Sequence, residues 1–440
     1  MLEIIANKYE KEDSELFELE PKSVLNPLNA LRVIKKLSMK WEEIGKLIKS
    51  DMSENYLKNI SMQRKTRFPT KDDLDGAILG LFRLQDIYKL KTKDLANGII
   101  EDIDIKNQMN SKDCYDIGLA AYMYKQGNLK RALLINDKLI EIDPSYPGAL
   151  NNSKLYEKEL LENGVSEEDF RKNIPLLNNT RFVNAPYLNA SYRISYEKLC
   201  RGEVEHNITE ISKLYCYYKM DRPFIRLAPI KVEIIHFEPL VVIFRNVMSD
   251  EEIKTLINIS LPSLHRSMVQ NSSTGGQMIA SYRISKNAWI TQKSHAIIKQ
   301  IAKRLSLMTN LNMKSGEALQ AKNNNESSKN HSMGIGNRIA TVLFYLTTPE
   351  KGGYTIFNKI NTIAKPTKRD ALFWYNLLRN GDGDLRTMHA ACPVLLGDKW
   401  VVNSWIREKG QEKFRPCALT SSIQERYVGD LGGAESNSYS

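Results

Sequence analysis

Apolar residues in the first part of the chain recur every three to four positions, a spacing that predicts amphipathic helices. One such helix follows Pro27 and covers residues 28–48, with Leu31 and Trp41 on its apolar face. A second is predicted over residues 72–88. Because a stripe of this kind normally packs into a core or against another helix, we expect an all-helical N-terminal region.

The pattern over residues 116–144 is typical of a tetratricopeptide-like helix pair. Ala120 and Ala132 supply small side chains where the two helices approach, and Gly127 stands at the turn between them. A third helix over residues 146–161 would cover the pair. One repeat cannot bury its own apolar face, so flanking helices must complete this core.

The pattern changes after about Pro229 to short runs rich in β-branched and aromatic residues, which favour strands. Strands are predicted over residues 232–235, 240–244, 339–346, 354–357, 371–375, 389–395 and 399–406, and helices over 250–259 and 293–307. Gly-rich turns between the short strands indicate a double-stranded β-helix, or jelly-roll barrel. The predicted fold class is therefore α+β, with helices first and a barrel at the C-terminal end.

Several of these strands carry distinctive sequences: RIATVLFYL from Arg338, ALFWYNL from Ala371, RTMHAACPV from Arg386 and GDKW from Gly397. This run resembles the catalytic region of collagen-type prolyl 4-hydroxylase alpha subunits, which are Fe(II)/2-oxoglutarate dioxygenases. The resemblance implies a helical, dimerisation-like segment (1–65), a tetratricopeptide-like peptide-substrate-binding domain (66–165) and, after a linker (166–228), a dioxygenase domain (229–417). The remaining residues have no match in the family, and their Gly and Ser predict a disordered tail (418–440).

The resemblance also implies site residues. Enzymes of this class hold iron with two His and one carboxylate, which leaves positions open for 2-oxoglutarate and dioxygen. By position, His389 matches the distal iron ligand, and Lys399 matches the lysine that pairs with the far carboxylate of 2-oxoglutarate. Fe(II), 2-oxoglutarate and ascorbate are the implied cofactors.

The other two iron ligands of the family form a His-x-Asp motif, expected here between Gln320 and Gly336. This chain instead reads AKNNNESSKNHSMGI, which contains no Asp. Glu326 and His331 are the residues of this stretch with ligand chemistry, but their polar setting is not that of a rigid strand. We therefore expect an incomplete iron site and an open barrel edge where the strand is missing.

Tyrosines crowd the predicted helix pair, and a groove lined by Tyr122 and Tyr156 would suit a proline-rich or collagen-like peptide. The alternative is that these rings pack between helices with their hydroxyls at the surface. Other partners implied by the resemblance are a protein disulfide isomerase beta subunit and a second alpha subunit.

Composition limits the other classes. The net charge of +11 is spread among interspersed acidic residues, so we expect no nucleic-acid partner. No apolar run approaches the ~20 residues of a membrane span. The cysteines Cys200/Cys216 and Cys392/Cys417 are spaced as disulfide partners often are, with free thiols as the alternative. The resemblance implies the endoplasmic reticulum lumen, although the first residues do not read as a signal peptide.

Three functional hypotheses remain open. The first is that the chain is a procollagen-proline 4-dioxygenase alpha subunit. The second is a non-catalytic relative that binds proline-rich peptide or a partner subunit, and the third is an incomplete gene product that lacks the segment with His-x-Asp. As the sequence stands, the active site is expected to be inactive.

Overall fold

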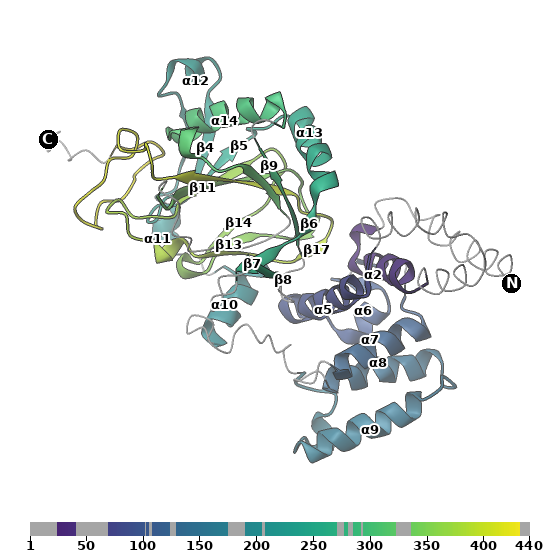
Figure 1. Ribbon diagram of the computed structural model, residues 1–440. Coiled ribbons are helices and arrows are strands. Elements are labelled where there is room, and N and C mark those ends of the chain that lie inside the picture. Colours follow the sequence, from purple (N-terminus) through teal and green to yellow (C-terminus); the bar gives the residue numbers. More distant parts are fainter. Residues whose placement is uncertain are drawn as a thin grey trace, which may run out of the picture. The chain divides into compact units, whose positions relative to one another are not determined.

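The computed structural model describes residues 24–40, 69–101, 103–104, 108–123, 129–174, 190–204, 207–270, 277–279, 285–291, 294–322 and 336–431. The chain forms two compact units, drawn in Figure 1. Unit 1 comprises Met1–Ala185 with Leu395–Gly397, and unit 2 comprises Pro186–Val394 with Asp398–Ser440. No helix among the described residues is long and apolar enough to cross a membrane.

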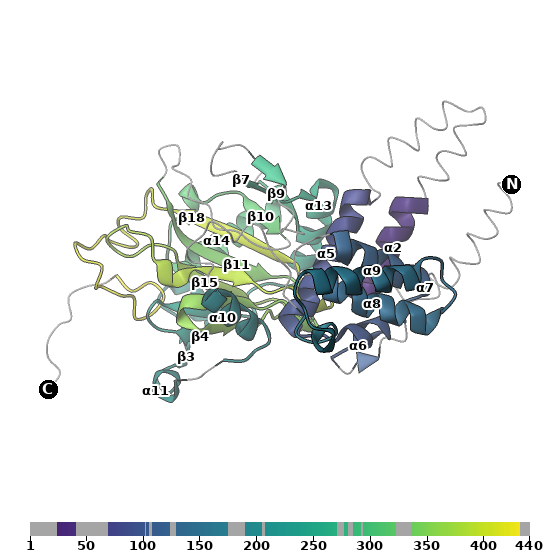
Figure 2. The same ribbon diagram turned by 90° about the horizontal axis from the view of Figure 1, so that it is seen from below.

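Unit 1 is helical, as predicted. Its elements are α2 (Pro27–Lys35), the π-helical turn η2 (Lys36–Lys40), α5 (Lys71–Tyr88), α6 (Thr92–Ala96), the short pair β1 (Ile99–Ile100) and β2 (Ile103–Asp104), α7 (Ser111–Met123), α8 (Leu129–Ile142), α9 (Ala149–Glu162) and η3 (Glu167–Asp169). Helix α7 packs on α8, and α8 packs on α9 (Figure 2). Helix α5 begins with a capping box, in which Thr70 and Asp73 satisfy each other's backbone N–H groups.

The predicted helix pair corresponds to α7 and α8, but one predicted contact is wrong. The small residues of α7 that face α8 are Gly118, which lies against Ile135, and the fully buried Ala121. Ala120 is only half-buried because it is turned about 100° around the helix from its neighbour. Ala132 is fully buried, as expected. The predicted turn at Gly127 lies outside the described residues.

Unit 2 is built around strands. Its helices are α10 (Ala190–Cys200), α11 (Ile208–Ile211), α12 (Pro223–Leu227), α13 (Asp250–Ser260) and α14 (Ala296–Thr309), with the single 3-10 turns η6 (Leu261–Ser263), η7 (Met313–Ser315), η8 (Asn358–Ile360) and η9 (Leu385–Thr387). Its strands are β3 (Cys216–Lys219), β4 (Ile230–His236), β5 (Val241–Arg245), β6 (His265–Arg266), β7 (Met268–Gln270), β8 (Gln277–Ile279), β9 (Lys286–Ile290), β10 (Leu319–Lys322), β11 (Arg338–Tyr345), β12 (Lys351–Gly352), β13 (Thr355–Phe357), β14 (Thr362–Ala364), β15 (Ala371–Tyr375), β16 (His389–Ala391), β17 (Val394–Leu396) and β18 (Val401–Arg407).

A 9-stranded sheet forms the centre of unit 2, in the order β3-β4-β5-β15-β11-β18-β10-β9-β6. Every neighbouring pair in it is antiparallel. Side chains alternate between its faces. On β11, Val342 and Phe344 join the core under α13 and α14, whereas Leu343 and Tyr345 join the core that includes β13 and β14. Figure 1 accordingly shows helices on one side of the sheet and the small sheet β14-β13-β16 on the other.

The predicted strands mostly match, with two corrections. The single strand expected over residues 389–395 is two strands, β16 and β17, because Pro393 between them has no N–H to donate. The region expected to be a linker is partly folded: it contains α10 and β3, and β3 forms an edge of the large sheet. Backbone pairing across β4 supplies order that the local sequence pattern of β3 did not reveal.

The cysteine pairing suggested by spacing is also wrong. The structure joins Cys200 at the end of α10 to Cys392 after β16, a sequence separation of 192 residues. Cys216 and Cys417 are exposed free thiols. The tertiary fold brings together one cysteine from each of the pairs suggested by spacing, because α10 packs against β13, the neighbour of β16.

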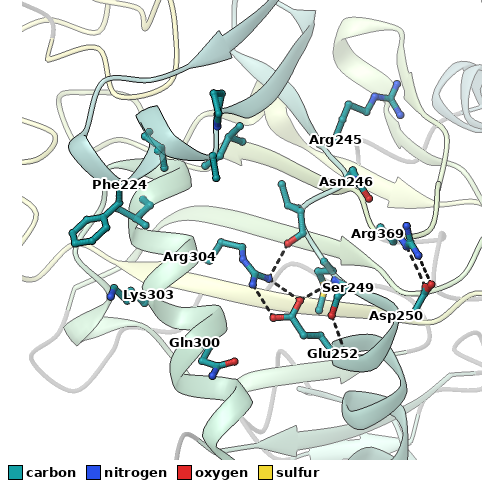
Figure 3. Close-up of a pocket in the computed structure, with 17 residues that line it drawn as sticks. Phe224, Arg245, Asn246, Ser249, Asp250, Glu252, Gln300, Lys303, Arg304 and Arg369 are labelled. Atoms are coloured by element: carbon teal, nitrogen blue, oxygen red, sulfur yellow. Dashed lines mark hydrogen bonds and ion pairs between the residues drawn. The ribbon is translucent and has the colours of Figure 1, made fainter.

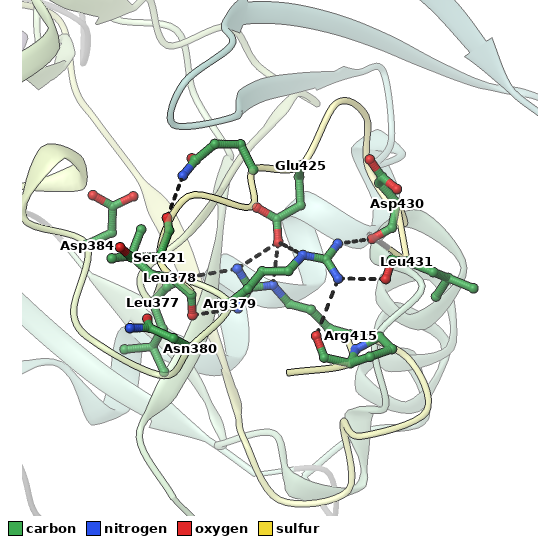
Figure 4. Close-up of polar contacts among 12 residues, drawn as sticks. Leu377, Leu378, Arg379, Asn380, Asp384, Arg415, Ser421, Glu425, Asp430 and Leu431 are labelled. Atoms are coloured by element: carbon green, nitrogen blue, oxygen red, sulfur yellow. Dashed lines mark hydrogen bonds and ion pairs between the residues drawn. The ribbon is translucent and has the colours of Figure 1, made fainter. Parts of the chain in front are cut away.

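The segment after Cys417 is packed up to residue 431, where a disordered tail was expected. Figure 4 shows how Arg379 and Arg415 both face Glu425, with ion-pair distances of 3.1 and 2.7 Å. Arg379 also donates to the carbonyls of Asp430 and Leu431. All three charged side chains are buried, so this network fixes the C-terminal segment to the loop after β15. Residues 432–440 lie outside the described residues.

Replacing Glu425 by Gln should lower the free energy of unfolding by about 3 kcal/mol, because two buried guanidinium groups lose the carboxylate that faces both. Urea unfolding followed by tryptophan fluorescence measures this. Limited proteolysis should also cut the segment after Arg415 faster. The exposed Glu412→Gln is the matched control, with a change within about 0.5 kcal/mol. Equal effects of the two substitutions would contradict a structural role for the network.

Candidate anion and metal site

Lys399 is the most unusual charged residue of unit 2. It stands just before β18 and is 1% exposed. Its Nζ donates to the carbonyl oxygen of Gly353 and lies 3.4 Å from Thr355 Oγ1. No ion pair joins it to a carboxylate anywhere in the described part of the chain. Burial lowers its pKa from the usual 10.5 to about 7. A buried cation without a carboxylate partner is a ready receptor for an anionic ligand.

The residues around this ammonium group are arranged to accommodate it. Gly353 has a φ of +71°, and a Cβ there would lie 3.4 Å from Lys399 Cδ and 3.0 Å from a ring carbon of Pro349. Glycine is therefore the residue that fits at position 353, where the backbone passes close to the Lys399 side chain. The Tyr345 hydroxyl donates to Thr355 at 2.9 Å, and burial raises the pKa of Tyr345 so that this hydroxyl keeps its proton.

His389 begins β16 and lies in an aromatic setting. Its ring centroid is 4.6 Å from that of Trp374 and 5.9 Å from that of Phe357. Its Nδ1 is 3.1 Å from the carbonyl oxygen of Thr387. A carbonyl only accepts, so Nδ1 must carry the proton and Nε2 keeps its lone pair. Burial lowers the pKa of His389, which favours the neutral imidazole that binds metals.

Strand β13 brings the two predicted site residues to the same side of the small sheet. Thr355, which touches Lys399, and Phe357, which touches His389, are two residues apart and so point to the same face. Phe357 is also the residue directly opposite His389 in the ladder. The spacing along β13 is roughly 7 Å, the length of a short dicarboxylate.

The iron site is not completed by the described residues. They contain no group of three or more His, Cys, Asp or Glu side chains placed to hold a metal ion. Strand β10 begins the stretch where His-x-Asp was expected, and its pairing partners are β18 and β9. Glu326 and His331 lie outside the described residues. The imidazole of His389 has the chemistry of one iron ligand, and the described residues do not supply the other two of a site with three protein ligands.

Among the described strands, β16, which carries His389, stands at an edge of the small sheet. In the small sheet, β16 is paired with β13, and no described strand pairs with its other side. A strand there would have its side chains next to the His389 imidazole.

The candidate peptide-binding tyrosines lie in unit 1 and pack on each other. The rings of Tyr122 and Tyr156 are 5.0 Å apart, and the Tyr122 hydroxyl donates to Glu159 at 2.7 Å. Tyr156 is buried, whereas Tyr122 is partly exposed. Only Tyr122 of this pair therefore offers its ring to the surface, and Tyr156 supports it from below.

Sequence reasoning missed the groups that hold the two site residues in place. Thr355, Tyr345 and Gly353 form the surroundings of Lys399, and Trp374 and Phe357 those of His389. The sequence gives one indication of these groups: Thr355 and Phe357 flank Ile356 in a predicted strand and therefore point to the same face. The pattern alone does not identify the residues that this face contacts.

Comparison with known families agrees with both halves of the chain. A model described as the N-terminal region of the prolyl 4-hydroxylase alpha-subunit matches residues 1–102. A model described as the 2OG-Fe(II) oxygenase superfamily matches residues 311–407, which include His389 and Lys399.

Two relatives that match along most of the chain point the same way. Prolyl 4-hydroxylase subunit alpha-1 of Caenorhabditis elegans is 41% identical over 486 residues, which covers 98% of this chain and 87% of the relative. The human subunit alpha-1 is 33% identical, covering 90% of this chain and 85% of the relative. The first alignment is longer than the 440 residues of this chain, so the relative contains internal segments that this chain lacks. A crystal structure of a viral collagen prolyl hydroxylase is 22% identical with a TM-score of 0.29 and covers 38% of this chain and 95% of its own.

Replacing Lys399 by Met should stabilise the chain by on the order of 2–4 kcal/mol at pH 7 and below, because the buried charge is removed. The folded-state pKa of about 7 lies below the unfolded value, so wild-type stability rises with pH from about 7 upward as the folded protein binds fewer protons. The difference between variant and wild type should therefore shrink toward pH 10. Urea unfolding at several pH values measures it. A difference that does not change with pH, or an equal effect of the exposed Lys359→Met, would contradict the buried-charge explanation.

Proposed function

Because the chain belongs to the prolyl 4-hydroxylase alpha-subunit family, we propose that it binds proline-rich peptide and a 2-oxoglutarate-type dicarboxylate but does not turn them over by itself. The family's reaction hydroxylates peptidyl proline with Fe(II), 2-oxoglutarate, dioxygen and ascorbate. Two parts of that machinery have counterparts here: a helical unit with surface tyrosine and a buried lysine. The iron-binding His-x-Asp pair has none in the sequence between Gln320 and Gly336.

The observation that carries the proposal is the state of Lys399. Its ammonium group is buried, and its acceptors in the described part of the chain, the Gly353 carbonyl and the Thr355 hydroxyl, are neutral. A carboxylate placed there would form a charge-assisted hydrogen bond where water cannot compete. By itself, the single imidazole of His389 would hold Fe(II) weakly, because competing water ligands occupy the positions that a second His and a carboxylate would fill.

The finer structural assignments support the same proposal. The packing of α7 on α8 supports a tetratricopeptide-like pair, and the shared core of the large and small sheets supports a double-stranded β-helix. Membership of the family supports an endoplasmic reticulum location, a protein disulfide isomerase partner and an alpha–alpha contact through the N-terminal segment. The Cys200–Cys392 disulfide fits an oxidising compartment.

A full hydroxylase is the second candidate. It is favoured by one specific observation: His389 presents an unprotonated Nε2 on the same side of β13 as Lys399. That function needs further iron ligands, and the chain between residues 323 and 335 offers Glu326 and His331 as the residues of ligand type.

With metal removed by a chelator, wild-type protein should bind 2-oxoglutarate saturably at one site, measured by isothermal titration calorimetry. Lys399→Met should weaken this binding at least about ten-fold, because it removes the charge-assisted hydrogen bond. Affinity should fall as pH rises above about 7, where the free lysine loses its proton. The exposed Lys359→Met serves as the control and should bind normally. Absence of binding by the wild type would refute the anion-site part of the proposal.

Turnover separates the two candidates. Purified chain with an isomerase partner, Fe(II), ascorbate and a proline-rich peptide should release no CO2 from 2-oxoglutarate above an iron-free control. Peptide-dependent release above that control would establish the hydroxylase reading and contradict our proposal.

A proline-rich, collagen-like peptide should bind the full chain. Tyr122→Ala should weaken that binding by roughly five-fold, because the variant loses the contacts of the Tyr122 ring with the preformed polyproline helix of the peptide. Fluorescence anisotropy of a labelled peptide measures it. Glu159→Gln keeps the ring and should change the affinity by less than about two-fold. The exposed Tyr218→Ala in unit 2 is the residue-matched control, and an equal loss there would argue against a site at Tyr122.

A further inference from the structure

Unit 2 contains a pocket on the helix-covered face of the large sheet, opposite the face that packs on the small sheet with His389. Its volume is about 690 Å³, within the range of ligand-binding pockets. It lies between α12, the turn from β5 into α13, and α14 (Figure 3). The apolar wall is made by Phe224, Ile225, Ile230, Val247 and Leu307.

The charges around the pocket are mostly used by internal ion pairs. Arg304 holds Glu252 by two bonds of 2.8 Å and also donates to the carbonyl of Val247. Arg369 is paired with Asp250. These contacts, visible in Figure 3, leave the pocket rim rigid and its arginines already bound to carboxylates.

Lys303 differs from these arginines. It is exposed on α14, and no carboxylate pairs with it among the residues that the structure describes. Its Nζ lies 5.1 Å from the centre of the Phe224 ring, a cation–π contact at the mouth of the pocket. Phe224 is 65% exposed, so its ring lies at the surface beside the ammonium group of Lys303.

Ion pairs neutralise the three arginines of the lining. Arg304 and Arg369 are paired with Glu252 and Asp250, and Arg245 is paired with Glu233 and Asp370. Among the described residues, Lys303 is the lining cation that these pairs leave available, so an anion is favoured over a cation as a ligand. Apolar side chains line the pocket together with the polar Asn246, Ser249 and Gln300, and the apolar body of such a ligand gains by leaving water.

We propose that this pocket binds a small amphiphilic carboxylate, with an aromatic or branched apolar body on Phe224, Ile230 and Leu307 and its carboxylate at Lys303. The pocket is separate from the anion site at Lys399, because neither Lys399 nor its acceptors Gly353 and Thr355 line it. The inference does not depend on the proposed function.

A matched pair of probes tests the charge requirement: 3-phenylpropanoate and its uncharged amide, titrated into the full chain by ligand-observed NMR. The acid should bind about five-fold more tightly than the amide, through one charge-assisted contact at a half-open site. Excess 2-oxoglutarate should not displace it. No saturable binding of the acid, equal affinity of acid and amide, or displacement by 2-oxoglutarate would overturn the proposal.

Variants on the same two helices locate the site. Lys303→Gln should abolish the preference for the acid, and Phe224→Ala should weaken both probes about three-fold or more. Two controls are exposed neighbours that do not line the pocket: Lys299→Gln on α14 and Leu227→Ala on α12, which should leave binding unchanged. All four side chains are at the surface, so folding, checked by thermal unfolding, should be preserved. Equal effects of Lys299→Gln and Lys303→Gln would place the binding elsewhere.

Discussion

Burial of both faces of the 9-stranded sheet is the constraint on which the rest of unit 2 depends. Strands β5, β11 and β15 are buried at nearly every position, so both faces of the sheet must be shielded from water by other elements. Helices α13 and α14 cover one face, and the small sheet covers the other. The space between the two sheets is then a dry interior, and any charge inside it acts at low dielectric.

Lys399 and His389 derive their properties from that interior. Desolvation lowers the pKa of both side chains. Lys399 therefore gains or loses its proton near neutral pH, and the neutral form of the His389 imidazole is favoured. The same desolvation makes an unpaired ammonium group costly, and binding an anion relieves that cost. The Arg379–Glu425–Arg415 network handles burial differently: its charges are matched within the fold, and their role is to fix the C-terminal segment in place.

Much of the architecture could be predicted, since it rests on local periodicity. The strand over residues 371–375 was predicted with the observed bounds, and the helices at α13 and α14 were predicted to within three residues at each end. Elements that depend on distant partners were missed. Strand β3 is ordered by pairing with β4, and the packed segment up to residue 431 depends on Glu425 meeting two arginines from elsewhere.

By itself, the sequence determined the family, the positions of His389 and Lys399, and the loss of His-x-Asp, because these are matters of residue identity and order along the chain. Only the tertiary structure decided which cysteines meet, that Tyr156 is buried beneath Tyr122, and that β16 is an edge strand among the strands described. It also decided that Lys399 has neutral neighbours and Lys303 an aromatic one. Each of these depends on contacts between residues far apart in sequence, which a local pattern does not encode.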